Sequence, residues 1–220
     1  MKSVGTENIS PWPEWFIPGF SGSPWPAWDE PEPDVVQGYQ DLVVALRNGI
    51  DAITAARPPA DVLQAAERHV LDVVELLAPW ETGEERQLAG RLVEHAGNGS
   101  TLVPPISYTE QHAGGCRGSV RFGRRHLGGG NAAHGGMHAL VFDQILGQQV
   151  ALATQQLCRT AYLHIDYRAV TPLHTELAFT AGVDRIEGRK AFVSGRLHDG
   201  DRLLCDASAL FITAEVPRAD

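Results

Sequence analysis

Hydrophobic positions change their spacing near the middle of the chain. In residues 34–57 and 59–77 the apolar side chains recur every three or four positions, which predicts two amphipathic helices. Pro58-Pro59 separates them, because proline disfavours the interior of a helix. Residues 84–95 predict a further short helix. The first hundred residues are therefore expected to be mainly helical.

After residue 100 the hydrophobic period becomes two, as in half-buried strands. Residues 106–111 and 117–125 predict a hairpin around residues 113–115. Its second strand places Val120 and Phe122 on one face and polar residues on the other.

Later stretches continue this alternation. Residues 157–170 and 173–186 predict two strands, and tight turns at Glu187-Gly188 and Asp199-Gly200 separate the strands that follow, the last ending at 210–213. The order of elements is two strands, one long helix and an antiparallel meander. A long helix wrapped by such a sheet is the hot-dog architecture, so the expected class is α+β, a hot-dog fold with a helical N-terminal extension.

The helix predicted between the strands covers residues 131–147 and is expected to run to about Ala153. At about 100° per residue, one of its faces carries a lone carboxylate, Asp143, among mostly small side chains. The other members of this face are Gly136, Ala139, Leu140 and Gly147. Small residues permit close approach by another backbone, and Asp143 is a candidate catalytic group. The alternative is an ordinary solvent-facing helix residue.

His134-Gly135-Gly136 opens this helix after the glycine run 128–130. Backbone amides at a helix N-terminus can bind a negatively charged oxygen, so the stretch is a candidate oxyanion site. His134 and His138 also have the spacing of the zinc ligands in an H-E-x-x-H helix. Position 135 is glycine, however, so the general base of that motif is missing and no metal is expected.

Composition narrows the classes of function. Hydrophobic residues make up 43% and no apolar run approaches the length of a membrane span. The beginning of the chain lacks a secretory signal, and Cys116, Cys158 and Cys205 are an odd number at irregular spacing, so free thiols and a cytoplasmic location are expected. The net charge of −9 argues against a general nucleic-acid binder.

Residues 1–33 form a proline-rich stretch without periodicity that contains Trp12, Trp15, Trp25 and Trp28. We expect an extended arm whose indoles lie on the body of the protein or on a partner subunit. The predicted division is an arm at 1–33, a helical extension at 34–100 and a hot-dog domain at 101–220.

Several motifs in the second half share one order and nearly one spacing with a known family. They are His134-Gly135-Gly136 with Asp143 nine positions after the histidine, Arg159-Thr160-Ala161, Ile165-Asp166-Tyr167-Arg168, and Ile186-Glu187-Gly188-Arg189-Lys190. With these motifs the chain resembles the hot-dog acyl-CoA thioesterases of the phenylacetate-pathway type. It is most similar to the mammalian long-chain acyl-CoA thioesterases related to the carboxyl-terminal modulator protein.

The resemblance implies hydrolysis of an acyl-CoA thioester at a dimer interface. Asp143 would be the general base or the nucleophile, Gly136 N–H the oxyanion donor, and His134 and Thr160 would orient the acyl group or a water. The residues implied to bind substrate are Asn131, Gly135, Asp166, Arg168, Arg189 and Lys190. No cofactor is implied, because CoA is part of the substrate, and the assembly would be a homodimer or a dimer of dimers.

The sequence departs from the family at two points. Many relatives have Asn six positions before the first histidine, where this chain has Gly128, and Asn131 is the nearest asparagine. The interval from Asp143 to Thr160 is one residue longer than in the mammalian members. Two other functions stay open: a hot-dog hydratase or dehydratase, although Gln148 replaces the histidine five after Asp143, and a non-catalytic acyl-CoA-binding or interaction protein.

Overall fold

The computed structural model describes residues 31–83, 86–90, 92 and 99–213. These residues form, in chain order, α1 (Pro33–Ala55), α2 (Ala60–Leu77), η2 (Ala78–Trp80), β1 (Ile106–His112), β2 (Gly115–Arg121), η4 (Arg124–His126), β3 (Leu127–Gly129), β4 (Ala132–Ala133), α3 (Gly135–Thr154), β5 (Cys158–Tyr167), β6 (Glu176–Glu187), β7 (Lys190–Asp199) and β8 (Arg202–Thr213). The predicted arm with its four tryptophans lies outside the described residues up to position 30.

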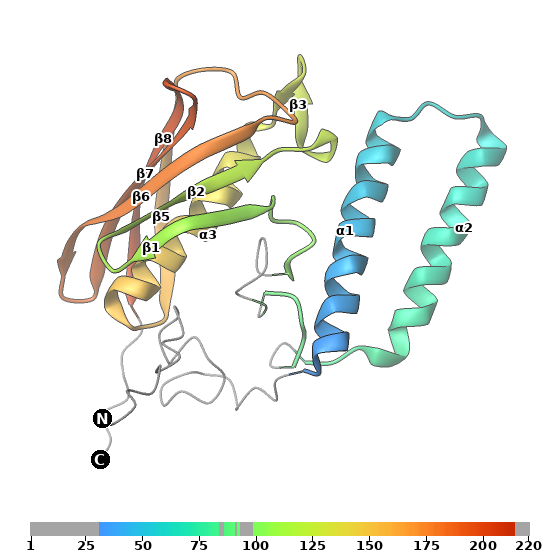
Figure 1. Cartoon of the computed structure of the whole chain (residues 1–220), viewed down its shortest axis with the longest axis horizontal. Helices are drawn as coiled ribbons and strands as arrows, with labels where there is room; N and C mark the ends of the chain where they lie inside the picture. Colours follow the sequence, from blue (N-terminus) through green and yellow to red (C-terminus); the bar gives the residue numbers. More distant parts are fainter. Residues whose placement is uncertain (1–30, 84–85, 91, 93–98, 214–220) are drawn as a thin grey trace, which may run out of the picture.

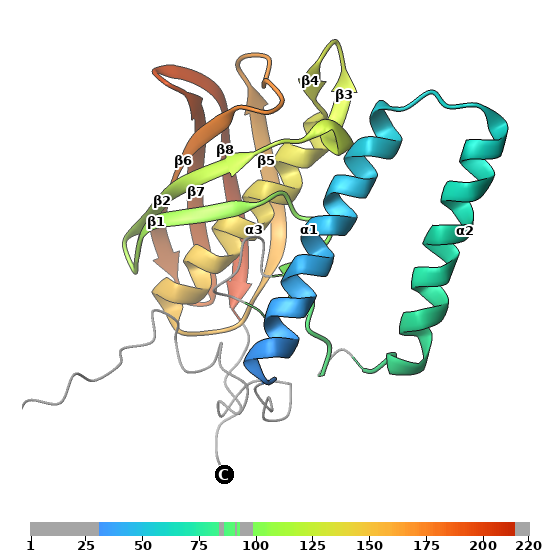
Figure 2. The ribbon, with the colours of Figure 1, turned by 45° about the vertical axis from the view of Figure 1, so that its right-hand side comes forward.

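The main sheet of the described chain has six antiparallel strands in the order β1-β2-β6-β7-β8-β5. Helix α3 lies along one face of this curved sheet (Figure 1, Figure 2). Its inner side buries Phe142, Ile145 and Leu146 against strand residues such as Val120 and Leu197. Side chains that are fully buried in this way supply the main stabilisation of the fold. The predicted hot-dog fold is confirmed.

Strand β5 does not lie beside β6, its successor in the chain. It pairs with β8 at the far edge of the sheet, and β6 pairs with β2 instead. The meander is therefore limited to β6, β7 and β8, whose turns contain Gly188 and Gly200 at positive φ, as the two predicted turns require. The alternating pattern of β5 identifies a strand but contains no information about its neighbour.

Helix α3 begins later than the sequence pattern indicated. Residues 131–133 belong to a short hairpin of β3 and β4, and Asn131 sits at its turn with φ 60°. His134 is the N-cap and Gly135 the first helical residue. The sequence interpretation was wrong here because Asn131 adopts a left-handed turn conformation, which asparagine tolerates better than most residues.

The two N-terminal helices differ in how they pack. Helix α1 buries Val43 and Arg47 and contacts η4, whereas α2 buries none of its residues. Figure 1 shows α2 on the side of α1 away from the sheet. The described residues 86–90 form turns and bends instead of the predicted short helix. Among the described residues, no helix combines the length and apolar composition that crossing a bilayer requires.

Candidate active site

Asp143 projects from the exposed side of α3, because its neighbours Val141 and Phe142 turn the other side of the helix into the core. Its Oδ1 accepts a hydrogen bond from the Thr160 hydroxyl at 2.7 Å. Thr160 lies on β5 at an irregularity of the pairing with β8. The structure therefore brings together two residues that are 17 positions apart, and the threonine fixes one oxygen of an exposed carboxylate.

A cavity of about 540 Å³ opens beside this pair. Helix α3 lines it with Gly147 and Ala151 in addition to Asp143, and β8 contributes Phe211. A Cβ atom on Gly147 would lie 3.3 Å from the Phe211 ring. The small residue at 147 thus makes room for an aromatic side chain of the same chain.

Cys158 also lines the cavity, and its thiol donates to the Gly147 carbonyl at 3.6 Å. Burial, together with the negative charge of Asp143, raises the pKa of Cys158 to about 12. A thiol with such a pKa is almost entirely protonated near neutral pH and is a poor nucleophile. Asp143 is therefore the better candidate for the reactive group of this cavity. All three cysteines of the chain are free thiols.

His134 caps the N-terminus of α3. Its Nδ1 accepts the Gly136 N–H at 2.9 Å, so this nitrogen carries no proton. The amide assigned to the oxyanion site is therefore engaged by the histidine ring. A substrate oxygen can receive the Gly136 N–H only where it replaces the ring nitrogen as the acceptor.

A cluster around the buried His138 supports this helix start, and its role was missed in the sequence. His138 contacts the Thr171 hydroxyl through Nε2 at 2.7 Å and packs against the rings of Phe122 and Tyr167. The Tyr167 hydroxyl donates to the Gly135 carbonyl at 2.8 Å. Burial lowers the pKa of His138. The period-two pattern of β5 places Tyr167 on the helix side, but the partner of its hydroxyl depends on the tertiary structure.

Gly128 explains one departure from the family pattern. A Cβ atom at this position would lie 2.6 Å from the Cα atom of His134, so no side chain fits. Asn131 lies at the exposed hairpin turn three residues later. Gly135 is similarly confined, since its Cβ would lie 3.1 Å from the Tyr167 hydroxyl.

Asp166 and Arg168 lie in an ionic cluster on the opposite side of β5 from Tyr167. The Arg168 guanidinium contacts Asp206 at 2.8 Å and Asp166 at 3.1 Å, and His164 contacts Asp166 at 3.4 Å. Hydrogen bonding and the two carboxylates raise the pKa of Arg168. The cluster borders a separate cavity of about 360 Å³.

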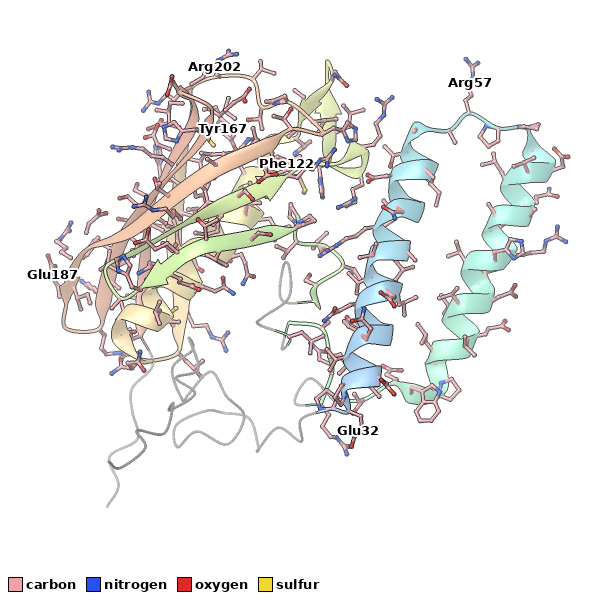
Figure 3. The ribbon with its side chains drawn as sticks, viewed as in Figure 1. Glu32, Arg57, Phe122, Tyr167, Glu187 and Arg202 are labelled. Carbon is pink, nitrogen blue, oxygen red and sulfur yellow. The ribbon has the colours of Figure 1, made fainter. Side chains whose placement is uncertain are left out.

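Arg189 and Lys190 lie at the other end of the sheet from Arg168. The Arg189 Nε donates to the Thr213 carbonyl at 2.9 Å, and Thr213 pairs with Cys158 at the start of β5. Figure 3 shows Tyr167 and Glu187, which mark these two ends. Arg168 and Arg189 therefore do not share one site within a chain, and the predicted substrate-binding residues form two separate groups in this structure.

Comparison with known proteins agrees with this fold. The family model described as "Thioesterase superfamily" matches residues 130–206. "Putative esterase PA0474" of Pseudomonas aeruginosa is 34% identical over 95 residues, which cover 42% of this chain and 71% of that protein. "Acyl-coenzyme A thioesterase THEM4" of Xenopus laevis is 37% identical over 84 residues, and the match covers 36% of each protein. The chain thus spans about a third of the length of THEM4.

A solved structure extends the similarity beyond the matched segment. The crystal structure of protein RHA08564, a thioesterase superfamily protein, superimposes with a TM-score of 0.66 at 26% sequence identity. The superposition covers 79% of this chain and 94% of that one. The chain therefore belongs to the thioesterase superfamily, a family of thioester hydrolases, and has its hot-dog fold.

Proposed function

We propose that the protein hydrolyses an acyl-CoA thioester to a free acid and CoA, with Asp143 as the reactive carboxylate. The observation that carries the proposal is the 2.7 Å hydrogen bond from Thr160 to Asp143 at the edge of the cavity. A positioned carboxylate can take a proton from water or attack the thioester carbonyl itself. THEM4 of Xenopus laevis, by its name an acyl-coenzyme A thioesterase, supports this substrate class.

In the general-base version, Asp143 removes a proton from a water held by Thr160. The resulting hydroxide adds to the thioester carbonyl and forms a tetrahedral oxyanion. When the oxyanion collapses, the carbon–sulfur bond breaks and CoA leaves as a thiolate that takes up a proton. In the nucleophilic version the carboxylate adds to the carbonyl, the carbon–sulfur bond breaks and CoA leaves as a thiolate that takes up a proton. Water then hydrolyses the resulting mixed anhydride to the free acid and regenerates the carboxylate. Both versions need a hydrogen-bond donor for the oxyanion.

The Gly136 N–H is our proposed donor. A single oxyanion donor lowers the barrier by about 2.7–4 kcal/mol, whereas an ordinary hydrogen bond contributes a net of about 1 kcal/mol to stability. If the carbonyl oxygen replaces the His134 Nδ1 as the acceptor of the Gly136 N–H, the loss of the first hydrogen bond destabilises the protein less than the second stabilises the transition state. His134 would turn toward the acyl group as this happens.

The spacing along α3 requires two chains for such a site. Gly136 and Asp143 are seven residues apart, which corresponds to about 10 Å along a helix axis. A donor and a base acting on one carbonyl must both lie within about 3 Å of the reacting atoms. A second copy with an antiparallel α3 would bring its Gly136 opposite Asp143, with the half-buried Ala139 and Leu140 near the symmetry axis.

We assign the charged end of CoA to Arg189 and Lys190. Lys190 pairs with Ile212 of β8, and Ile212 pairs with Arg159 of β5, so the two basic residues lie near the end of β5 that carries Thr160. Asp166 and Arg168 form an ion pair with each other, and they would contact substrate only if that ion pair were replaced by contacts with the substrate. The phosphates of CoA would bind to the basic pair by charge-assisted hydrogen bonds.

The test is CoA release from a series of acyl-CoA esters, followed with a thiol reagent. Asp143→Asn should lower turnover at least about a hundredfold, because a positioned base is lost. Thr160→Val keeps the shape of the side chain but removes the hydroxyl, and should cost about tenfold or less. Asp201→Asn, at the exposed β7–β8 turn, is the matched control and should leave turnover unchanged.

Two outcomes would contradict the proposal. Turnover of Asp143→Asn within a few-fold of the unchanged protein would remove Asp143 from the mechanism. Calorimetric binding of acyl-CoA with no release of CoA by any preparation would favour the non-catalytic binding protein, and hydration of an enoyl-CoA without CoA release would favour the hydratase.

A further inference from the structure

The cavity beside Asp143 is not built by the hot-dog fold alone. One wall comes from the segment that follows the N-terminal helices, which contributes Gln87, Gly90, Ser100 and Val103. Val103 is 7% exposed and belongs to the same buried cluster as Phe211 of the sheet. The N-terminal extension thus takes part directly in the shape of the candidate active site.

Helix α1 holds this wall in place through two residues eight positions apart, Tyr39 and Arg47. The Tyr39 hydroxyl donates to the Gly99 carbonyl at 3.1 Å. Arg47 is 6% exposed, and its guanidinium donates to the carbonyls of Ser100 and Val103, the latter at 3.1 Å. These contacts are made to backbone carbonyls, so they fix the path of the segment and not only one side chain.

A second contact fixes α1 itself on the hot-dog domain. Asp51, one turn after Arg47, receives the Arg125 guanidinium at 2.6 Å, and its carboxylate also accepts the Arg125 backbone N–H. A partly buried bidentate arrangement of this kind is geometrically specific. Arg47 and Asp51 together therefore define the position of residues 99–103 relative to α3.

The chemistry of the cavity changes along α3. At one end lie Asp143 and Thr160, and the small residues Gly147 and Ala151 follow at intervals of four, over about 12 Å of helix axis. The polar side chains of Gln144, Gln148 and Arg159 also border the cavity. Leu157 and Phe211 border the same strip. A thioester carbonyl held at Asp143 would direct its acyl chain along this strip, in the cavity that Val103 also lines.

Resting on the thioesterase function proposed above, we propose that the α1-supported segment 99–103 is the wall that sets acyl-chain length. Val103 is the specificity-determining residue, and Arg47 is a positioning residue that acts through the backbone of that segment. The group bound there is an apolar acyl chain, and the extension is part of the substrate site instead of an independent module.

The experiment measures kcat/KM over a series of straight-chain esters from butanoyl-CoA to palmitoyl-CoA. Val103→Ala should move the optimum toward longer chains and Val103→Phe toward shorter ones, each changing the long-to-short ratio about tenfold, since one methylene in a hydrophobic pocket is discriminated about that strongly. Arg47→Met should broaden the profile. Arg68→Met, on the exposed surface of α2, is the matched control and should keep the profile unchanged.

A purely structural role would lower all rates together, so opposite shifts by the two Val103 variants are the decisive result. Calorimetric affinities for the same esters, in an Asp143→Asn background, give the same profile without turnover. Unchanged affinity and rate profiles in both Val103 variants would overturn the inference while leaving the thioesterase function intact. Failure of the unchanged protein to release CoA would count against the function alone, because the binding profile still tests the wall. Thermal unfolding checks that Arg47→Met is folded.

Discussion

Asp143 owes its candidate role to its place on the exposed side of α3. In a single chain the carboxylate stays in contact with water, so the desolvation cost of its charge is small. The Thr160 hydroxyl, at 2.7 Å, nevertheless holds one of its oxygens. The Asp143 carboxylate is thus both held in place and accessible from solvent, as a general base or a nucleophile must be.

His126 is a second residue whose surroundings change its chemistry. It is 4% exposed, and its Nδ1 accepts the Gly123 N–H at 2.9 Å. Its backbone carbonyl accepts the His134 N–H at 2.8 Å, directly beside the start of α3. Burial, with a contribution from Arg125, lowers the pKa of His126 from 6.5 to about 4.

We predict that stability falls as the pH is lowered through the window from 6.5 to about 4. In this window the unfolded chain binds a proton at His126 that the folded chain does not bind. The stabilisation is complete above pH 6.5, and its loss at the acid end is at most about 3 kcal/mol. Urea unfolding at several pH values measures it.

The matched variants for this prediction are His126→Asn and His69→Asn. Asparagine can keep an acceptor for the Gly123 N–H but does not titrate, so the pH dependence should flatten. It should not vanish, because burial also lowers the pKa of His138. His69 is exposed on α2, and its replacement should leave the slope unchanged. A slope identical in all three proteins would exclude His126 as its source.

At the scale of elements, contacts from outside the helix hold the N-terminus of α3. Tyr167 of β5 donates to the Gly135 carbonyl, and His138 of the helix contacts Thr171. Gly128 of β3 lies so close to His134 that it can carry no side chain. The start of the helix is therefore fixed by three neighbouring segments, which preorganises the amide proposed to face the oxyanion.

Removing the Tyr167 hydroxyl should loosen this helix start. Tyr167→Phe keeps the ring against His138 but loses the bond to the Gly135 carbonyl. We expect a loss of about 0.5–1.5 kcal/mol in unfolding free energy. We also expect a several-fold lower kcat with little change in KM, because only the transition state uses a well-aligned Gly136 N–H.

Tyr162→Phe is the matched control on the same strand, since the Tyr162 side chain is 48% exposed. It should change neither stability nor kcat. An unchanged kcat for Tyr167→Phe together with a raised KM would assign Tyr167 to substrate binding and not to alignment of the helix.

At the scale of the whole molecule, the residues of the proposed site lie far apart within one chain. Gly136 and Asp143 lie about 10 Å apart along α3. Arg168 and Arg189 lie near opposite ends of β5, where they donate hydrogen bonds to the carbonyls of Leu204 and Thr213 of β8, respectively. An antiparallel pair of chains would combine the Asp143 end of one with the Gly136 end of the other.

Complementation between two inactive variants tests this arrangement. Asp143→Asn removes the base, and Gly136→Pro removes the amide hydrogen at a first-turn position where proline is tolerated. If each site uses Asp143 of one chain and Gly136 of the other, a mixed dimer has one intact site. Random exchange should then restore about a quarter of the original activity.

Each variant alone should be inactive, and activity should appear only after co-refolding or co-expression. Sedimentation should show dimers or larger symmetric assemblies for every preparation. If the mixture recovers no activity although mixed dimers are detected, for example by mass spectrometry with differently tagged chains, the site would lie within one chain.

The sequence alone determined much of the local structure of this protein, but not the hairpin at 127–133 or the turns at 86–90. Period-two alternation defined the strands after residue 106, and the glycines at 188 and 200 defined their turns, because these signals depend on neighbours in the chain. The helix with Asp143 and the motif with Thr160 were likewise recognisable. The alternation and the order of elements indicated the fold, and these motifs carry the resemblance from which the family was expected.

The tertiary structure alone decided which distant residues meet. It placed β5 beside β8, put Arg168 and Arg189 at opposite ends of the sheet, and joined Arg47 of α1 to the wall of the Asp143 cavity. The periodicity of a single segment does not predict these contacts, because they follow from burying the apolar faces of several elements at the same time. The wall built by the N-terminal extension is the part of the candidate site that the sequence pattern could not predict.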